Sequence, residues 1–169
     1  PKDINEEELV KLFDKGFNGL KLHPSGQKFE VDSEDFFWIY EMCEKRKLPV
    51  LIHCAEAVDY AHPKRMINLS RKFPNLNIIM AHFFGNEIDL IDEAVDLPNL
   101  YTDTSIQSRT LRIHQAFYDK GYDRMLFASD TPYDSQGVAL LKIRESNLKK
   151  KDEELILSGN AEKILRLNN

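Results

Sequence analysis

The chain has 169 residues, 42% of them hydrophobic and 10% aromatic, which is enough apolar material for one packed domain and excludes global disorder. No apolar run approaches the roughly 20 residues of a membrane-spanning helix, so we expect no membrane association. The formal net charge of −5 gives no electrostatic basis for nucleic-acid binding. Two cysteines and a polar start of the sequence favour a reducing, cytoplasmic location.

Helical and strand patterns alternate along the chain. In chain order we predict helices at residues 5–15, 33–46, 63–73, 86–96, 108–120, 136–148 and 152–167, with an interruption near Gly159 in the last. Strands are predicted at residues 19–23, 49–53, 77–82, 99–104 and 124–130. Asn5 is expected to cap the first helix, and Asp32 with Ser33 the second. This order predicts an α/β fold with a parallel sheet, and apolar neighbours within the strands indicate that both faces of the sheet are covered.

Ionisable residues stand at the ends of the predicted strands. Four strands end in His23, His53, His82 and Asp130, and Asp103 belongs to the remaining one. Since the carboxyl ends of parallel strands meet at one edge, these side chains can converge into one site, and imidazole with carboxylate suits Zn²⁺ and similar ions. Each residue also has a structural interpretation: a histidine can be a hydrogen-bonded boundary residue, and an aspartate can cap a helix. For Asp103 we favour the helix cap.

Six segments occur in an order that resembles the amidohydrolase superfamily, in its amidohydrolase-related branch of metal-dependent hydrolases and decarboxylases. They are residues Gly16–Pro24, Leu48–Cys54, Phe73–His82, Asn99–Ser105, Leu126–Tyr133 and Gly159–Ala161. The resemblance implies a (β/α)8 barrel of the TIM type, of which this chain holds about five βα units, corresponding to strands 4 to 8. Residues 1–169 are therefore expected to form a single partial-barrel domain.

The resemblance also implies roles for residues at the strand ends. His53 matches a metal ligand at the end of barrel strand 5. His82 matches the strand 6 histidine, which binds a second metal in binuclear members and transfers a proton or polarises the substrate in mononuclear ones. Asp130 matches the strand 8 aspartate, which contacts the metal and the attacking water. His82 and Asp130 are thus the expected catalytic residues, and His53, His82 and Asp130 the expected metal ligands.

Three further residues are expected to border the substrate pocket. Lys21 falls on strand 4, where some binuclear members carry a metal-bridging carboxylated lysine; the alternative interpretation is a surface residue of an edge strand. His23 shares the face of Lys21 because side chains alternate along a strand. Tyr133 follows Asp130 in the adjoining loop.

One feature departs from the family pattern. The family begins its barrel with a His-x-His pair, whereas the five histidines of this sequence are never two residues apart. A full barrel takes about 250 residues. Two explanations stay open: the chain is a fragment of a longer enzyme, or it is a complete short protein that lacks catalysis and depends on oligomerisation or a partner chain.

The expected function follows from the resemblance. We expect a metal-dependent hydrolase in which a divalent ion activates water against a small ester, lactone or amide, or a lyase in which the ion assists decarboxylation. Zinc is the preferred ion and manganese the second choice. The expected partners are a small-molecule substrate and further copies of the chain. The alternative is a non-catalytic partial-barrel module.

Overall fold

The computed structural model describes residues 5–85 and 87–167. Its centre is a parallel sheet whose five strands are hydrogen-bonded in chain order. The strands are β1 (Leu20–Leu22), β2 (Val50–Ile52), β3 (Ile78–Met80), β4 (Leu100–Asp103) and β5 (Met125–Leu126). This arrangement confirms the predicted α/β fold with five βα units, and it leaves β1 and β5 at the two edges of the sheet among the described strands.

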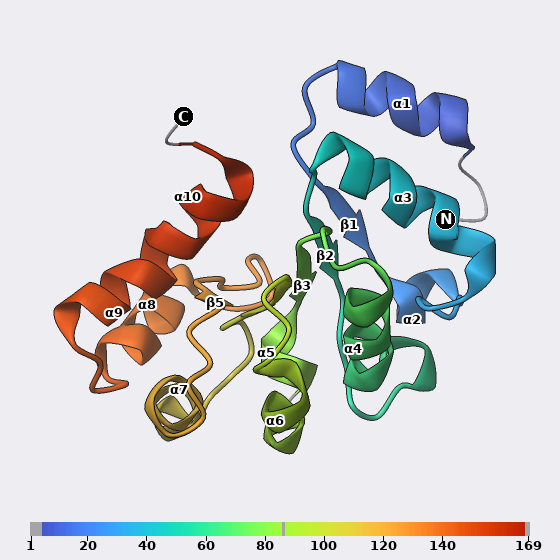
Figure 1. Ribbon diagram of the computed structural model, residues 1–169. Helices are drawn as coiled ribbons and strands as arrows, with labels where there is room; N and C mark the ends of the chain where they lie inside the picture. Colours follow the sequence, from blue (N-terminus) through green and yellow to red (C-terminus); the bar gives the residue numbers. More distant parts are fainter. Residues whose placement is uncertain (1–4, 86, 168–169) are drawn as a thin grey trace.

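Helical segments connect the strands and follow the outer side of the curved sheet (Figure 1). They are α1 (Glu6–Asp14), α2 (Pro24–Gln27), η1 (Glu34–Phe36), α3 (Phe37–Arg46), η2 (Asp59–Ala61), α4 (Pro63–Lys72), α5 (His82–Gly85), η3 (Ile88–Leu90), α6 (Ile91–Ala94), α7 (Thr110–His114), η4 (Gln115–Asp119), α8 (Gln136–Arg144), α9 (Lys150–Glu154), η5 (Leu155–Gly159) and α10 (Asn160–Leu165). In the described ranges, no helix combines the length and the apolar character that crossing a bilayer requires.

The predicted cap of the first helix is confirmed, and that of the second is wrong. The Asn5 side chain accepts a hydrogen bond from the Glu8 amide, and Glu8 returns one to the Asn5 amide, which is a capping box. Ser33 makes no such bond. Asp32 pairs at 2.6 Å with Arg65 of α4, so its carboxylate joins two βα units instead of capping a helix.

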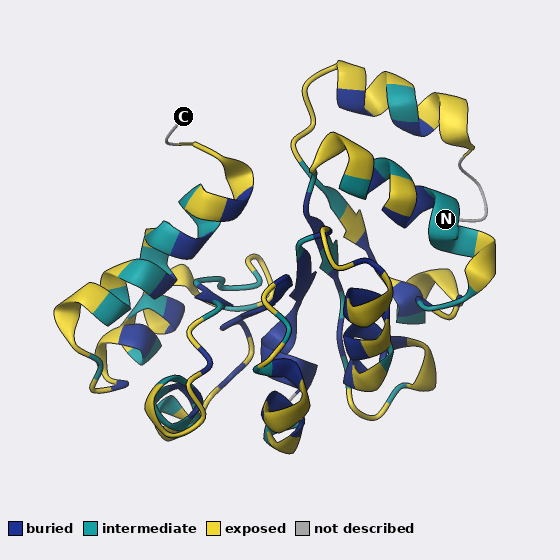
Figure 2. Cartoon of the chain, viewed as in Figure 1, coloured by how far each residue is buried: buried dark blue, intermediate teal, exposed yellow. Residues whose placement is uncertain are grey.

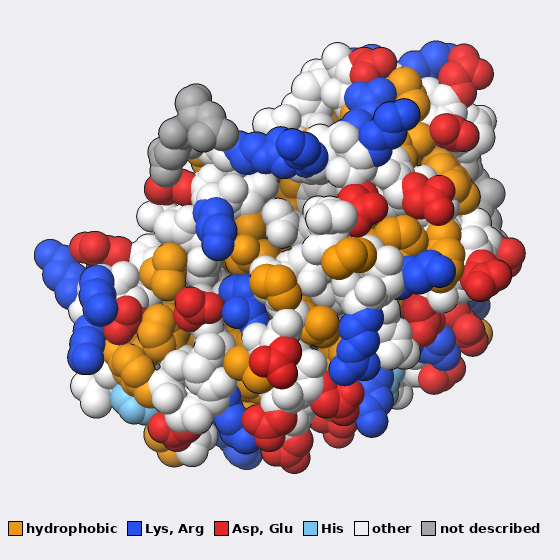
Figure 3. Space-filling model, viewed as in Figure 1, with side chains coloured by type: hydrophobic (Ala, Val, Ile, Leu, Met, Phe, Trp, Pro, Cys, Tyr) orange, Lys and Arg blue, Asp and Glu red, His pale blue; other side chains and the backbone are white. Residues whose placement is uncertain are grey.

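The outer face of the sheet is covered, as the apolar strands predicted, whereas the inner face is covered only in part, since Lys21 on β1 is exposed and Leu51 on β2 is half-buried. The main core lies between the sheet and the outer helices and contains Val50, Ile52 and Ile78, all fully buried. A smaller cluster on the opposite, inner face joins Ile79, Tyr101 and Leu126 to Ile164 of α10. Figure 2 shows β3 and β4 buried at the centre, β1 more exposed, and exposed residues on the outer sides of the helices. On the face seen in Figure 3, acidic and basic side chains are intermixed over these helices.

Three predicted elements differ from the structure. The last strand pairs only over Met125–Leu126, because the next amide that faces β4, that of Ala128, donates to the Thr104 hydroxyl at 3.3 Å instead of a backbone carbonyl. The predicted interruption near Gly159 is present but differs in form: the final helix widens into the π-helical turn η5, which ends at Gly159, while φ there stays helical at −56°. Residue 86, where the predicted helix 86–96 begins, lies outside the described residues, and the remainder forms η3 and α6.

Candidate functional site

Three histidines meet at the carboxyl ends of the first three strands. His23 follows β1 and His53 follows β2, whereas His82 lies two residues beyond β3. The His23 and His53 rings stack, with centroids 3.9 Å apart and planes inclined by 11°. Nδ1 of His53 lies 3.0 Å from Nε2 of His82. Residues 29 or more positions apart in sequence are thus brought together by the parallel sheet.

The backbone at His82 is left-handed. φ is 68° at His82, 48° at Phe83 and 57° at Phe84, and Gly85 follows at 59°. Left-handed conformations cost roughly 1–2 kcal/mol for a residue with a side chain, so the surrounding structure must hold this turn. The His82 amide donates to Asp103 at 2.9 Å, and the Phe84 amide donates to Thr102 at 3.2 Å. Two side chains of β4 therefore anchor the turn.

Asp103 performs a role that the sequence did not indicate. Its Oδ1 accepts the amides of His82 and Ser105 and the Ser105 hydroxyl. The expected helix cap is wrong, because the next helix, α7, begins after Arg109 and has no side-chain cap. Ser105 was not identified as a site residue from the sequence, although its Oγ lies 2.8 Å from Nδ1 of His82. The only sequence signal for it was its place two residues after Asp103 at a strand end.

Burial favours the neutral forms of His53 and His82. Burial lowers the pKa of His53 to about 4, assisted by the positive charges of His23, His82 and Lys21, while Asp130 acts in the opposite direction. Burial also lowers the pKa of His82, against the attraction of Asp103 and Asp130. Neutral imidazoles keep a lone pair for a cation or a proton.

Asp130 lies in a loop beyond β5, with a left-handed φ of 61°. It lines a hollow of about 410 Å³ together with Lys21, His82 and Asp103. A second hollow of about 370 Å³, bordered by His53, Cys54 and Ile106, is also lined by His82. His82 thus faces two adjoining spaces, one polar and charged and the other mainly apolar.

Of the three residues expected to border the substrate pocket, Lys21 lines one of the two hollows, whereas His23 and Tyr133 line neither. Lys21 lines the polar hollow, and burial lowers its pKa while Asp103 and Asp130 raise it. His23 accepts the Gly26 amide at its Nδ1 and stacks on His53, so it supports that ring and lies outside the lining of both hollows. Tyr133 is 89% exposed and also lies outside the lining of both.

The spacing of two histidine nitrogens fits a divalent ion, whereas the number of grouped donors does not. With metal–nitrogen distances of 2.0–2.1 Å and angles at the ion of about 90–110°, two imidazole nitrogens on one ion lie about 2.8–3.4 Å apart. The 3.0 Å between His53 Nδ1 and His82 Nε2 meets this spacing. Within the described residues, however, no three His, Cys, Asp or Glu side chains form a group that could hold a metal. Asp103 and Asp130 are the carboxylates that line the same hollow as His82.

Comparisons with known proteins place these features in a wider group. A family model described as Amidohydrolase matches residues 1–167. No curated protein matches the sequence.

Solved structures match at the level of the fold. An uncharacterized TIM-barrel protein from Bordetella bronchiseptica matches with 24% identity and a TM-score of 0.82, over 95% of this chain and 61% of its own. A 2,6-dihydroxybenzoate decarboxylase from Rhizobium matches with 20% identity and a TM-score of 0.75, over 96% and 67%. A dihydroxybenzoic acid decarboxylase from Polaromonas sp. JS666, with bound manganese and the inhibitor 2-nitroresorcinol, matches with 18% identity and a TM-score of 0.66, over 83% and 56%. The chain therefore spans about three fifths of the length of such proteins.

Proposed function

The chain belongs to the amidohydrolase family, and from this premise we propose that His53, His82 and Asp130 contribute to a divalent-metal centre for a small substrate. The reaction is hydrolysis of an ester, lactone or amide, or decarboxylation. The observation that carries the proposal is the 3.0 Å between His53 Nδ1 and His82 Nε2, which matches two ligands of one ion. Residues 1–169 act as one partial-barrel domain.

The proposed roles follow from position and chemistry. His53 and His82 would hold the ion through their facing ring nitrogens, with Asp130 as the neighbouring carboxylate. A divalent ion bound there supplies a Lewis acid that polarises a carbonyl group or acidifies a water molecule. Asp130 accepts a proton at its carboxylate, and the Lys21 ammonium, in the same hollow, attracts a carboxylate group of the substrate.

The choice of ion and reaction rests on donor chemistry and on the neighbours. Nitrogen donors favour zinc, whereas a structural neighbour holds manganese, so both ions belong in the test. Two decarboxylases among the neighbours support decarboxylation of an aromatic acid as the first reaction to assay. Two free, buried cysteines, Cys43 and Cys54, support a reducing, cytoplasmic location.

A second candidate is a non-catalytic module that self-associates. It is favoured by the two strand edges, β1 and β5, that pair with no further strand within the described residues, and by the incomplete donor group. Exposed strand edges are ready templates for pairing with another chain.

Metal titration of the purified protein tests the proposal. Calorimetry with Zn²⁺ and Mn²⁺ should give one site per chain, and His53→Ala should weaken it at least tenfold. His114→Ala is the matched control, because His114 lies on α7 and contacts Ser146 and Tyr118 instead of the cluster. Absence of binding, or equal affinity in the two variants, would refute the metal centre. A metal-free oligomer in sedimentation analysis would support the second candidate.

A further inference from the structure

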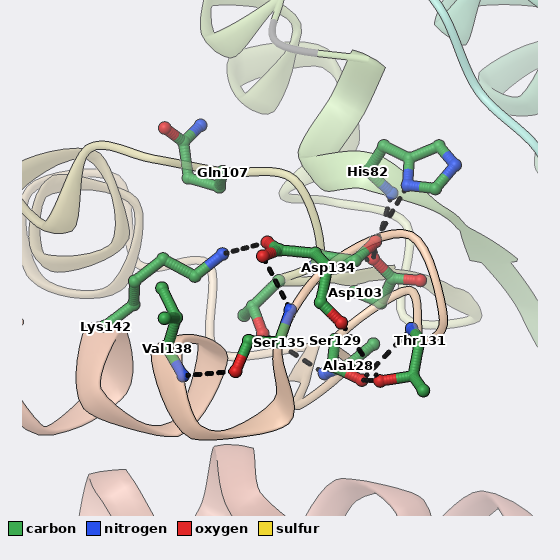
Figure 4. A network of polar contacts seen from close by, with 12 residues as sticks. His82, Asp103, Gln107, Ala128, Ser129, Thr131, Asp134, Ser135, Val138 and Lys142 are labelled. Carbon is green, nitrogen blue, oxygen red and sulfur yellow. Dashed lines mark hydrogen bonds and ion pairs between the residues drawn. The ribbon is translucent and has the colours of Figure 1, made fainter.

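A line of buried hydrogen bonds runs from Asp103 through Ser105 to the ring of His82. Asp103 is 6% exposed, Ser105 1% and His82 7%. Ser105 Oγ lies 2.5 Å from Oδ1 of Asp103 and 2.8 Å from Nδ1 of His82. Figure 4 shows His82 directly beside Asp103, joined to it by a dashed line, while the buried Gln107 points away from them.

The hydrogen atoms available on Asp103, Ser105 and His82 determine which atom donates in each of these hydrogen bonds. Oδ1 of Asp103 accepts the amides of His82 at 2.9 Å and Ser105 at 3.0 Å, so it acts as an acceptor throughout. The single hydroxyl proton of Ser105 then lies between Oγ and Oδ1, in a short bond typical of a charged acceptor. Ser105 Oγ has only lone pairs left for His82, and the proton of that contact must come from Nδ1.

We propose that Asp103 and Ser105 are positioning residues that hold His82 as the Nδ1–H tautomer, with the Nε2 lone pair directed at His53. The inference rests on the proposed function in one respect, since Nε2 is the atom that would bind the ion or accept a proton. The opposite tautomer would place a proton on Nε2, in the direction of the proposed ion. It would also leave Nδ1 and Ser105 Oγ as two acceptors facing each other at 2.8 Å.

The Asp103 carboxylate contacts the backbone of His82 directly and its ring through Ser105. Through the amide it holds the left-handed φ of 68°, and through Ser105 it sets the ring proton. In the metal-free protein, His53 Nδ1 completes the line by donating to the Nε2 lone pair across 3.0 Å. Polar partners of this kind commonly fix the tautomer of a metal-binding histidine and raise its basicity.

Imidazole ¹⁵N chemical shifts of the metal-free protein test the inference. A protonated ring nitrogen and one with a lone pair have widely separated shifts, so the tautomer of His82 can be determined directly. In the unsubstituted protein, Nδ1 should have the protonated shift and Nε2 the lone-pair shift. In Ser105→Ala, the two shifts should move toward each other or exchange, whereas Ser105→Thr, which keeps the hydroxyl, should restore the original pattern.

Ser129→Ala is the matched control, because Ser129 lines the same hollow but bonds to Thr131 instead of a histidine. Its His82 shifts should stay unchanged. A His82 protonated at Nε2 in the unsubstituted protein would overturn the inference, as would a Ser105→Ala spectrum equal to that of Ser129→Ala.

A second measurement separates this inference from the proposed metal centre. Ser105→Ala should weaken zinc affinity about 10- to 100-fold, whereas Ser105→Thr should not. If no protein binds zinc but the shifts behave as described, the metal centre fails and the tautomer assignment stands. If zinc binds and the shifts do not respond to Ser105→Ala, the metal centre stands and the tautomer assignment fails.

Discussion

Gly85 closes the left-handed turn that carries His82, and its replacement by alanine should destabilise the protein strongly. An ideal Cβ at this position would lie 2.8 Å from the Glu56 amide nitrogen and 3.0 Å from the Ala55 Cα. Both contacts are with backbone of the segment that follows β2, so a side-chain rotation cannot relieve them. Because φ at Gly85 is 59°, alanine also adopts a conformation that costs roughly 1–2 kcal/mol.

Gly121→Ala separates the two effects. Gly121 has a similar φ of 67°, but a Cβ there would have nothing within 4 Å. We therefore expect Gly121→Ala to lower the free energy of unfolding by about 1–2 kcal/mol through conformation alone. Gly85→Ala should lower it by a further 1–3 kcal/mol or so, the usual range for overpacking.

Urea denaturation followed by circular dichroism measures both variants. The free energy of unfolding should fall at least about 1 kcal/mol further in Gly85→Ala than in Gly121→Ala, consistent with the overpacking contribution. Gly85→Ala should also weaken zinc binding, because the displaced turn carries His82. Equal destabilisation of the two variants would refute the close packing of the turn against residues 55 and 56.

Three further outcomes follow from the contacts described. Asn99→Ala should lower the free energy of unfolding by about 3 kcal/mol in urea titrations. The reason is that the buried Asn99 amide donates to three carbonyls and its oxygen accepts the Ser70 hydroxyl. A loss below about 1 kcal/mol would contradict this expectation. Tyr122→Phe should cost only about 1 kcal/mol in the same assay, since one buried bond to the Leu100 carbonyl is lost, and a larger loss than for Asn99→Ala would be inconsistent with that count. The free energy of unfolding should also fall as the pH is lowered from 6.5 to about 4, because unfolded His53 takes up a proton in that window while the folded residue does not. In His53→Gln, the free energy of unfolding should depend less on pH over this range. The same pH dependence in both proteins would argue against the lowered pKa of His53.

The order of elements was accessible from the sequence because it depends on local signals. Short apolar segments between helical patterns located all five strands, and Asn5 before three glutamates located the first helix start. Parallel pairing of successive strands then brought His23, His53 and His82 to one edge. These predictions need only periodicity and the geometry of βαβ units.

The detailed site depended on contacts between residues far apart in the chain. The left-handed turn after β3 has two phenylalanines where glycine is the usual signal, and it is held by Asp103 and Thr102, both about 20 residues later. The short β5 ends where the Ala128 amide bonds to the side chain of Thr104, 24 residues earlier, instead of to a backbone carbonyl. Tertiary hydrogen bonds of this kind override local propensity.

In the proposed metal centre, His53 and His82 share one divalent ion beside Asp130. Anomalous X-ray diffraction from crystals soaked in Mn²⁺ or Zn²⁺ tests it most directly. We expect one peak per chain within coordination distance of His53 Nδ1 and His82 Nε2, on the side of the polar hollow that contains Asp130. A map without a peak at this position, or with the ion bound only at other residues, would contradict it.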